Sequence, residues 1–399
     1  MRNKMPTSIP TRILALATNP ETGASTRFRV LQWRPVLEAA GFQLSLDTFF
    51  SLQGARSLYA PGRLAPKVAD VVSGAFHRWR ILTQAHQRAE LLFIHREAFP
   101  LGRRVGWKAL EQFPGPVIYD YDDAMFLPQR QGRGFLARLE DLETPNAIMQ
   151  RSHVVFAGNR FLADYARQYA RRVVLLPTCI DTQRFTPSTT VWDGRRPLIV
   201  GWIGSHSTAK YLRSLRPVLE RVARAVPFRL YVVGCPERLR WEGIEVEQRE
   251  WNLASEVSDF QQCDVGIYPL WNDPWAQGKC GFKAIQFMAC GVPIVAAAVG
   301  ANQEIIQDGV NGYLASTEED WVQKLQQLLS TSLLRAQFGV AGQETIEARY
   351  SLRAHASTLI AALREASDAQ GDTTGPMGQS VEAPVAIAPM GELVQERDR

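Results

Sequence analysis

Short runs rich in Val, Ile and Leu alternate along this chain with longer segments in which apolar residues recur at helical spacing. Repeated strand–helix–strand units favour parallel sheets with helices on both faces. The runs fall into two series, separated by a loop-like segment at 177–197 that contains Pro, Ser, Thr and Gly. We therefore predict an α/β fold with two doubly wound, Rossmann-like domains that face each other across a cleft.

The domain boundaries follow from the same pattern. We expect an N-terminal domain over 1–185, a C-terminal domain over 186–350 and a segment at 351–365 that is a candidate for packing back onto the first domain. Residues 366–399 have the aperiodic Gly, Pro, Ser, Thr and Glu composition that is typical of a disordered tail. The predicted strands are 12–17, 43–46, 91–95, 117–121, 153–157, 173–176, 198–203, 229–233, 265–268 and 294–298; the main predicted helices are 26–40, 160–169, 210–225, 254–263 and 282–290.

Composition excludes several classes of protein. The longest apolar stretch, 287–301, is too short for a transmembrane helix and is interrupted by Gly and Pro. No signal-peptide pattern follows the first residues. The five cysteines lie without CxxC pairs or His neighbours at zinc-ligand spacing, which indicates neither a disulfide framework nor a structural zinc site. We expect a cytoplasmic protein without a bound metal.

Charge is distributed unevenly between the two halves. Residues 1–185 contain 25 Lys and Arg against 15 Asp and Glu, and the remainder contains 20 against 25. Two interpretations stay open for the basic half: contact with an anionic surface such as the inner face of a membrane, and an ordinary solvated surface. Without a groove-binding motif, nucleic acid is not an expected partner.

The segment 278–299 combines a glycine turn, a short helix and a buried strand. Backbone N–H groups at a helix N-terminus attract anions, and Lys279 and Lys283 add positive charge. A phosphate or diphosphate is the expected guest of Lys279, Cys280, Gly281 and Phe282. A capped helix with two solvated lysines is the structural alternative.

Here the chain resembles the retaining glycosyltransferases of family 4, which have the two-domain GT-B architecture. Their motif, in a context like EGFGLVVLEAMACGVPVVA, aligns with GKCGFKAIQFMACGVPIVA. Similarity continues downstream through 300–312, upstream through 264–269, and in 176–185, which looks like the family's PNGVD...F. More loosely, it covers residues 12–365, including the Gly23 loop and the helix with Arg27 and Arg29.

Two departures from this motif affect function. Gly278 and Gln286 stand where the family has its two glutamates, which the resemblance links to the donor sugar and to the nucleotide ribose. An amide still accepts and donates hydrogen bonds, so Gln286 fits a ribose, whereas Gly278 has no side chain to offer. Sugar recognition is therefore expected from the backbone or from other residues, with Lys279, Asp273 and Trp275 as candidates.

The segment Gly204 to Lys210 matches the family's GR-x-x-x-x-KG loop, whose arginine and lysine grip the donor diphosphate. Lys210 occupies the lysine position and Ser205 replaces the arginine. A cation at a helix start gains nothing from the helix dipole, which favours a ligand role for Lys210 over an exposed structural one.

Polar residues also follow two predicted strands of the first domain. His95 ends the strand 91–95, while Asp122 and Asp123 follow the strand 117–121, and the carboxyl-end rule directs them toward the cleft. They are candidates for orienting or deprotonating an acceptor hydroxyl. Pairing of this acid cluster with Arg27 or Arg29 is the structural alternative, and a metal-binding DxD motif at Asp120 is a further one.

These features together predict a glycosyltransferase. The resemblance implies a retaining, metal-independent transfer from a UDP- or GDP-linked sugar to a glycan, lipid-linked or other hydroxyl acceptor, as in polysaccharide or glycolipid synthesis. The nucleotide sugar would be a co-substrate, and no cofactor is expected. Because two motif residues are missing, a non-catalytic glycan- or nucleotide-binding scaffold remains an alternative, as do a nucleotide-sugar epimerase and a sugar-phosphate phosphorylase on the same architecture.

Overall fold

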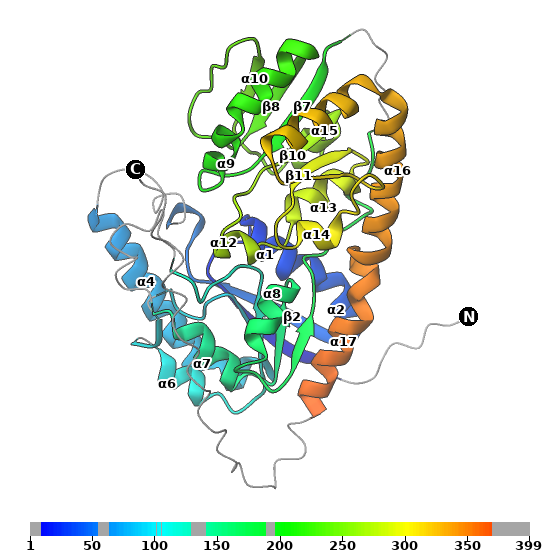
Figure 1. Cartoon of the computed structure of the whole chain (residues 1–399). Helices are drawn as coiled ribbons and strands as arrows, with labels where there is room; N and C mark the ends of the chain where they lie inside the picture. The colour runs from blue at the N-terminus through cyan, green and yellow to red at the C-terminus, as the bar shows by residue number, and fades with distance from the viewer. Residues whose placement is uncertain are drawn as a thin grey trace.

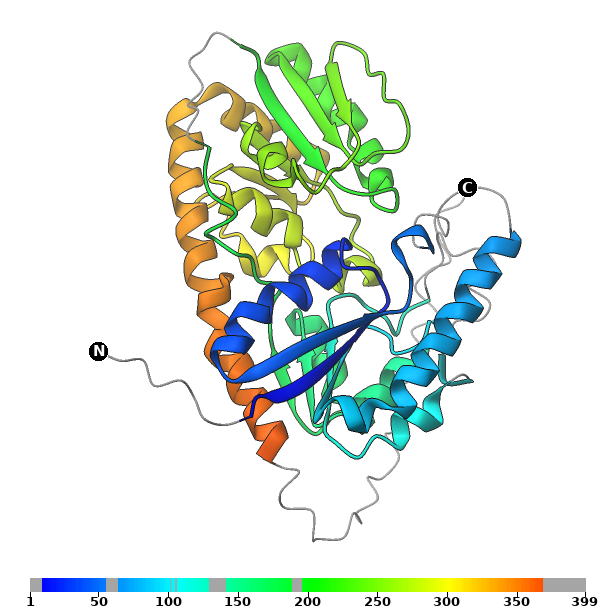
Figure 2. The ribbon, with the colours of Figure 1, turned by 180° about the vertical axis from the view of Figure 1, so that it is seen from behind.

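The computed structural model describes residues 9–54, 64–100, 102–104, 106–128, 141–188 and 196–368. Within these residues the chain forms two six-stranded parallel sheets, one in each half, and helices pack on both faces of each sheet (Figures 1 and 2). The predicted α/β fold with two Rossmann-like domains is confirmed.

The N-terminal sheet has the strand order β2-β1-β3-β4-β5-β6, which brings the carboxyl ends of β3 and β4 side by side near its middle. Its strands are β1 Thr11–Ala17, β2 Phe42–Thr48, β3 Leu91–His95, β4 Val117–Tyr121, β5 Val154–Ala157 and β6 Val173–Leu175. Its helices are α1 Ala24–Arg29, η1 Leu31–Trp33, α2 Arg34–Ala39, α4 Leu64–Thr83, α5 Ala85–Arg88, η2 Gly102–Arg104, α6 Trp107–Glu111, α7 Thr144–Arg151 and α8 Arg160–Ala166.

The C-terminal sheet has the order β12-β11-β10-β7-β8-β9. Its strands are β7 Leu198–Ile203, β8 Phe228–Val233, β9 Glu245–Arg249, β10 Val265–Tyr268, β11 Ile294–Ala297 and β12 Tyr313–Ala315. Its helices are α9 Ala209–Ser214, α10 Arg216–Ala225, α11 Glu256–Gln261, α12 Pro274–Gln277, α13 Phe282–Ala289, α14 Asn302–Ile305, α15 Glu318–Ser330 and α16 Ser332–Arg349, and α17 Leu352–Asp368 follows.

Sequence reasoning missed β9 and β12, the two edge strands of this sheet. β9 reads EVEQR and β12 has three residues, so neither forms the apolar run that marks a buried strand. Two predicted helices are also broken. Pro35 and Pro217 lie in the first turns of α2 and α10, where proline starts a new helix because it cannot donate the hydrogen bond that a continuing helix needs.

The last helices connect the two domains along one side of the molecule. In both views α16 runs along the C-terminal domain and α17 runs along the N-terminal domain (Figures 1 and 2). Leu359 and Leu363 of α17 join the apolar cluster formed by β1 and α2. Since α17 continues to Asp368, the first residues of the segment 366–399 are helical, and the rest of the expected tail lies outside the described residues.

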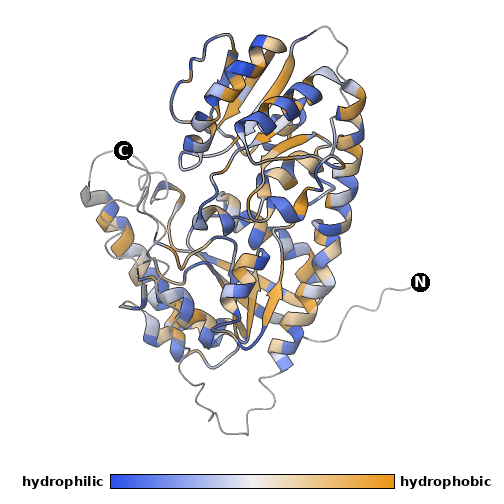
Figure 3. Cartoon of the chain, viewed as in Figure 1, coloured by the Kyte–Doolittle hydropathy of each residue, from blue (hydrophilic) through white to orange (hydrophobic). Residues whose placement is uncertain are grey.

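The hydropathy pattern follows this layering, since apolar residues fill the strands and the helix faces that pack on them (Figure 3). Some apolar side chains pack into the core of the opposite domain. Phe28 of α1 belongs to the apolar cluster of the C-terminal domain, where its ring lies 4.4 Å from that of Phe282. Cys280 belongs to a cluster of the N-terminal domain. The interface is therefore built from core-like contacts that bring α1 against α13.

A fully buried arginine ties α4 to the N-terminal sheet. Arg78 pairs with Asp47 of β2 and donates to the carbonyl oxygens of Ala98 (2.6 Å) and Ala17 (2.8 Å). Replacing Arg78 by Met should lower the free energy of unfolding by about 3–5 kcal/mol, because the buried Asp47 carboxylate loses its main partner. Urea unfolding measures the loss. Arg80→Met, at an exposed position of the same helix, is the control, and an equal effect of both variants would contradict this account.

Candidate interdomain site

The first part of the site is an ion pair beneath the carboxyl ends of β3 and β4. Asp120 is wholly buried and binds Arg29 through both of its oxygens. It also accepts a hydrogen bond from His95 Nδ1 at 2.8 Å. The predicted structural pairing thus occurs with Arg29, and Asp120 has both oxygens engaged. Arg29 and His95 already bind both oxygens of Asp120. The first aspartate of the alternative DxD motif is therefore not available as a metal ligand.

The next residues form a second charged group above this pair. Arg96 Nε lies 2.6 Å from Asp122 Oδ1, and Arg96 Nη2 lies 2.7 Å from Asp123 Oδ2. Burial acts to raise the pKa of Asp122, but the charges of Arg96 and His95 outweigh it and hold this pKa well below its usual range. Asp122 therefore stays ionised and is too weak a base to deprotonate a sugar hydroxyl efficiently at neutral pH.

His95 keeps one unused polar atom in this group. Its Nε2 is buried, lies 4.0 Å from Asp122 Oδ1 and has no hydrogen-bond partner among the described residues. A buried polar atom without a partner costs free energy, so such an atom points to a ligand that supplies the missing bond.

The segment 273–281, here called the donor loop after the role that the family resemblance implies for it, packs directly against this group from the other domain. Asn159 of the N-terminal domain donates hydrogen bonds to the carbonyl oxygens of Gln277 (3.0 Å) and Lys279 (3.1 Å). Cys280 Sγ donates to the Asp122 carbonyl oxygen at 3.2 Å. Lys279 Nζ lies 3.4 Å from Asp123 Oδ1. The structure thus brings the predicted residues Lys279, Cys280, Asp122 and Asp123 together.

The packing around Gly278 explains why glycine replaces the motif glutamate at this position. A Cβ atom at this position would lie 2.6 Å from Ala124 Cβ and 2.9 Å from the Ala124 backbone nitrogen. Any side chain here collides with the N-terminal domain, so the close approach of the donor loop requires glycine.

The start of α13 forms the polar end of the site. Gly281 has a φ of 64°, a left-handed conformation that glycine adopts without strain, and it places Phe282 and Lys283 in the first helical turn. The first N–H groups of a helix have no acceptor within it. Lys283 Nζ donates to Gln286 Oε1 at 2.8 Å, whereas the buried Gln286 Nε2 has no partner among the described residues.

The pKa of Lys283 reflects this setting. Burial lowers it to about 8, while the charge of Glu256 acts to raise it and that of Arg27 to lower it. At neutral pH this amine is therefore mostly protonated, and an anion beside it would stabilise the charged form.

Sequence reasoning missed a buried carboxylate next to Lys283. Glu256 of α11 makes two hydrogen bonds of 2.7 Å with Arg27 of α1 and a third, of 2.9 Å, with Arg184. Arg27 is thus paired across the interface instead of with the aspartate cluster. Arg27 was visible in the sequence as part of the resemblance, but its partner lies 229 positions away, and no local pattern marks it.

The loop of Gly204 and Ser205 leads from β7 into α9. Ser205 Oγ lies 3.0 Å from Ser207 Oγ, and the chain then enters α9. Lys210 Nζ stacks 4.8 Å from the ring centre of Trp271, so aromatic faces hold this cation. Burial raises the pKa of Tyr211 to about 12, with contributions from the charges of Asp273 and Asp123. α9 packs against the residue two positions before the donor loop, since Trp271 Nε1 donates to Ser214 Oγ at 3.1 Å.

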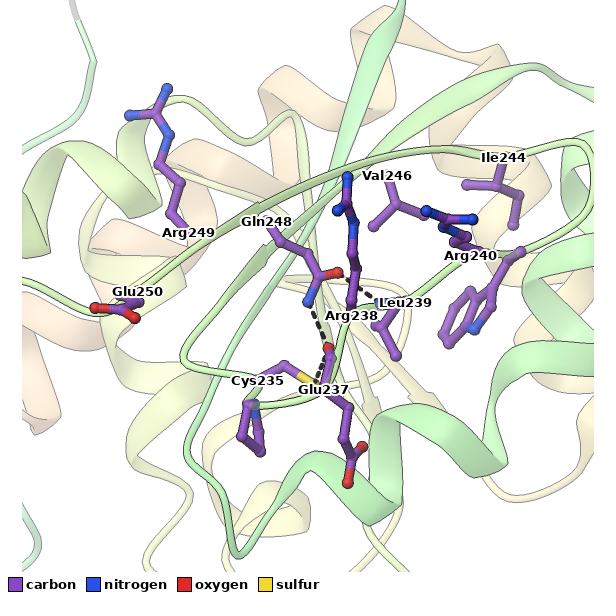
Figure 4. Close-up of a pocket in the computed structure, with 12 residues that line it drawn as sticks. Cys235, Glu237, Arg238, Leu239, Arg240, Ile244, Val246, Gln248, Arg249 and Glu250 are labelled. Carbon is purple, nitrogen blue, oxygen red and sulfur yellow. Dashed lines mark hydrogen bonds between the residues drawn. The ribbon is translucent and has the colours of Figure 1, made fainter. Parts of the chain in front are cut away.

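A separate hollow of about 620 Å³ lies under the loop between β8 and β9, at the edge of the C-terminal sheet (Figure 4). Its lining residues, within 235–250, include none of the residues that the sequence singled out. Gln248 makes two hydrogen bonds to this loop: it donates to the Glu237 carbonyl oxygen (2.8 Å) and accepts from the Leu239 backbone N–H (2.6 Å). The predicted residues that the structure brings together lie instead at the domain interface: His95, Asp122, Asp123, Lys279 and Cys280.

Comparison with solved structures gives the class of fold. Sucrose-phosphate synthase from Thermosynechococcus elongatus superposes with a TM-score of 0.68 at 17% identity, over 90% of this chain and 100% of that one. HepE from Anabaena, in complex with UDP and glucose, superposes with a TM-score of 0.61 at 16% identity, over 89% and 100%. The two domains therefore form a GT-B glycosyltransferase fold.

The family follows from sequence. Residues 197–331 match the family described as glycosyl transferases group 1. D-inositol 3-phosphate glycosyltransferases are similar: the protein from Stackebrandtia nassauensis is 30% identical over 240 residues, 51% of either chain, and that from Geodermatophilus obscurus is 24% identical over 310 residues, 67% of this chain and 65% of that one. The chain thus spans about half to two thirds of the length of these relatives, and the match to the glycosyl transferases group 1 family lies in its C-terminal domain.

The buried Glu256 allows a test of the interface. Glu256→Gln should lower the free energy of unfolding by about 3–5 kcal/mol, because Arg27 keeps its buried charge and loses its carboxylate partner. Arg160→Ala is the control, since its pair with Glu304 also crosses the interface but is exposed, and an exposed pair contributes about 0–1 kcal/mol. Calorimetric unfolding of both variants measures the difference. Equal losses would mean that Glu256 does not anchor the interface.

Proposed function

We propose that this protein transfers a sugar from a UDP- or GDP-linked donor to a hydroxyl group of a glycan, lipid-linked or other acceptor, with retention at the anomeric carbon and without a metal ion. The C-terminal domain would bind the donor and the N-terminal domain the acceptor. A role in polysaccharide or glycolipid synthesis follows from this chemistry.

The observation that carries the proposal is the unsatisfied polar end of α13 at the domain interface. It combines the first helical N–H groups, which have no side-chain cap, the half-buried amine of Lys283, and the Gln286 amide nitrogen, which has no partner among the described residues. These are hydrogen-bond donors that match a nucleoside diphosphate, whose phosphates accept at the helix start and whose ribose hydroxyls accept from an amide.

The relatives support the same donor class. The names of the sequence relatives describe glycosyl transfer to an inositol phosphate, and HepE has been solved with UDP-glucose as well as with UDP. A nucleotide sugar is the donor that fits both the names and the donor end of α13.

Each group of residues would have its own task. Lys210, Lys279 and Lys283, together with the backbone of Gly204, Ser205, Cys280, Gly281 and Phe282, would stabilise the departing diphosphate, where negative charge develops as the sugar–phosphate bond breaks. Gln286 would bind the ribose. His95 and Asp122 would orient the acceptor hydroxyl through hydrogen bonds, since the low pKa of Asp122 disfavours a role as general base. The closed interface would exclude competing water.

A thermal-shift screen tests donor binding. We expect one nucleoside diphosphate, among UDP and GDP, and one of its sugar conjugates to stabilise the wild type without metal, by about 2.7 kcal/mol at 100 times the dissociation constant. Lys283→Met should lose most of this shift, whereas Lys324→Met, elsewhere in the same domain, should keep it. A lack of response to any nucleotide would contradict the proposal. Binding without turnover of any nucleotide sugar would favour the non-catalytic scaffold, and conversion of the donor into an epimeric nucleotide sugar would favour the epimerase.

The pH dependence of binding gives a second test. In the free protein Lys283 loses its proton near pH 8, and a bound diphosphate favours the protonated amine. Nucleotide affinity should therefore be constant below about pH 7 and fall as the pH rises above 8, while Lys283→Met binds more weakly and without this fall. Titration calorimetry between pH 6.5 and 9.5 measures both curves. Identical profiles for the two proteins would exclude Lys283 from the phosphate site.

We further propose that the protein works in the cytoplasm at the inner face of the membrane. No helix in the described part of the chain is long and apolar enough to span a bilayer. One face of α4 carries four exposed apolar residues at helical spacing: Val68, Val72, Phe76 and Trp79. With the excess of basic residues in 1–185, this face suits an anionic lipid surface.

Vesicle sedimentation tests this contact. At low salt the wild type should sediment with vesicles of phosphatidylcholine and phosphatidylglycerol and remain in solution with phosphatidylcholine alone. The double variant Phe76→Ser/Trp79→Ser should lose most of the binding, because it removes the two largest apolar side chains of the exposed face. Equal recovery of the wild type in solution with both kinds of vesicle would contradict membrane contact.

A further inference from the structure

We propose that Asp123 binds hydroxyl groups of the transferred sugar and helps to set which donor sugar is accepted. This inference rests on the proposed function, and it gives a donor-side task to a residue that comes from the acceptor domain. It also identifies a carboxylate that can bind the sugar in place of the motif glutamate that Gly278 replaces.

The position of Asp123 supports this role. A diphosphate at the start of α13 places the attached sugar beside the loop that precedes the helix, because the sugar is bonded directly to the second phosphate. That loop contains Lys279, and the Asp123 carboxylate faces Lys279 Nζ at 3.4 Å from across the interface. Asp123 is therefore an N-terminal-domain carboxylate whose oxygen directly contacts a side chain of the donor loop.

The packing of Gly278 explains why the carboxylate comes from this side. A side chain at Gly278 would occupy the space of Ala124, the residue that follows Asp123. The same close approach that excludes a side chain from the donor loop therefore brings the Asp123 backbone to the loop. The glycine at position 278 and the placement of Asp123 therefore result from the same contact between the two domains.

Ion pairs fix the position of the Asp123 carboxylate, and part of its surface remains exposed. Arg96 binds its other oxygen at 2.7 Å, and the Asp123 side chain keeps 17% of its surface exposed. Arg96 adopts a φ of 64°, which is uncommon for a residue with a side chain and is found where the surrounding structure imposes it. A carboxylate fixed in this way can accept two sugar hydroxyls without the cost of ordering its own side chain.

A second, independent observation points to a ligand at this charged group. His95 Nε2, buried and without a partner among the described residues, lies 4.0 Å from the neighbouring Asp122 carboxylate. The charged group thus contains both an accessible acceptor for hydroxyl groups and an unused ring nitrogen. A solvated surface ion pair explains neither the strained backbone of Arg96 nor the buried nitrogen.

The test compares binding of the nucleotide with binding of the nucleotide sugar. UDP, GDP, UDP-glucose, UDP-galactose, UDP-N-acetylglucosamine and GDP-mannose are titrated into the wild type, Asp123→Asn and Asp123→Glu. Asp164→Asn, at an exposed position on α8, is the control. Hydrolysis of the donor without acceptor is measured in parallel, because it does not depend on acceptor binding.

We expect Asp123→Asn to bind the free nucleoside diphosphate within about twofold of wild type and to lose about 10- to 100-fold in the affinity gained from the sugar, the range for hydrogen bonds to a charged group. Donor hydrolysis should fall with it. Asp123→Glu, which keeps the charge and moves the carboxylate, should bind the nucleotide normally and change the ranking of the sugars. Asp164→Asn should match wild type.

Other outcomes overturn the inference in separate ways. If Asp123→Asn keeps the wild-type preference for the sugar conjugate and its hydrolysis rate but loses only transfer to an acceptor, Asp123 acts on the acceptor and the inference is wrong. If both Asp123 variants lose nucleotide and sugar binding equally, the residue only maintains the interface. If the wild type binds none of the six compounds, the proposed function itself fails.

Discussion

The close contact between the donor loop and the segment after β4 is the constraint on which the rest of the site depends. It brings Gly278 into contact with Ala124. It also lets Cys280 donate to the Asp122 carbonyl oxygen and places Lys279 beside Asp123. A side chain at position 278 would push the domains apart and separate these groups. The loss of a motif glutamate is therefore a packing requirement of this interface, and it does not by itself indicate a loss of activity.

Charge at the interface is balanced across domains. Asp120 neutralises Arg29 below the site, and Glu256 neutralises Arg27 beside it. Lys283 lies among these groups without a carboxylate of its own within hydrogen-bond distance among the described residues, which is why burial lowers its pKa to about 8. An anionic ligand at the start of α13 would supply the missing negative charge.

The sequence predicts the repeating fold well and the interface poorly, for physical reasons. Buried strands such as β3 and β10 are continuous apolar runs, whereas the edge strands β9 and β12 are polar or short and leave no such signal. Local motifs placed Lys279, Lys283 and Asp123 near strand ends or helix starts. The partner of Arg27 and the space at Gly278 depend on residues more than 100 positions away, which no local pattern encodes.

The central claim is that a nucleoside diphosphate binds where the start of α13 meets the N-terminal domain. A crystal structure of the wild-type protein soaked with UDP or GDP tests it directly. The account predicts phosphate density within hydrogen-bond distance of Lys283 and of the first N–H groups of α13, with the ribose beside Gln286. Nucleotide density in the hollow under the β8–β9 loop, with the start of α13 empty, would contradict it.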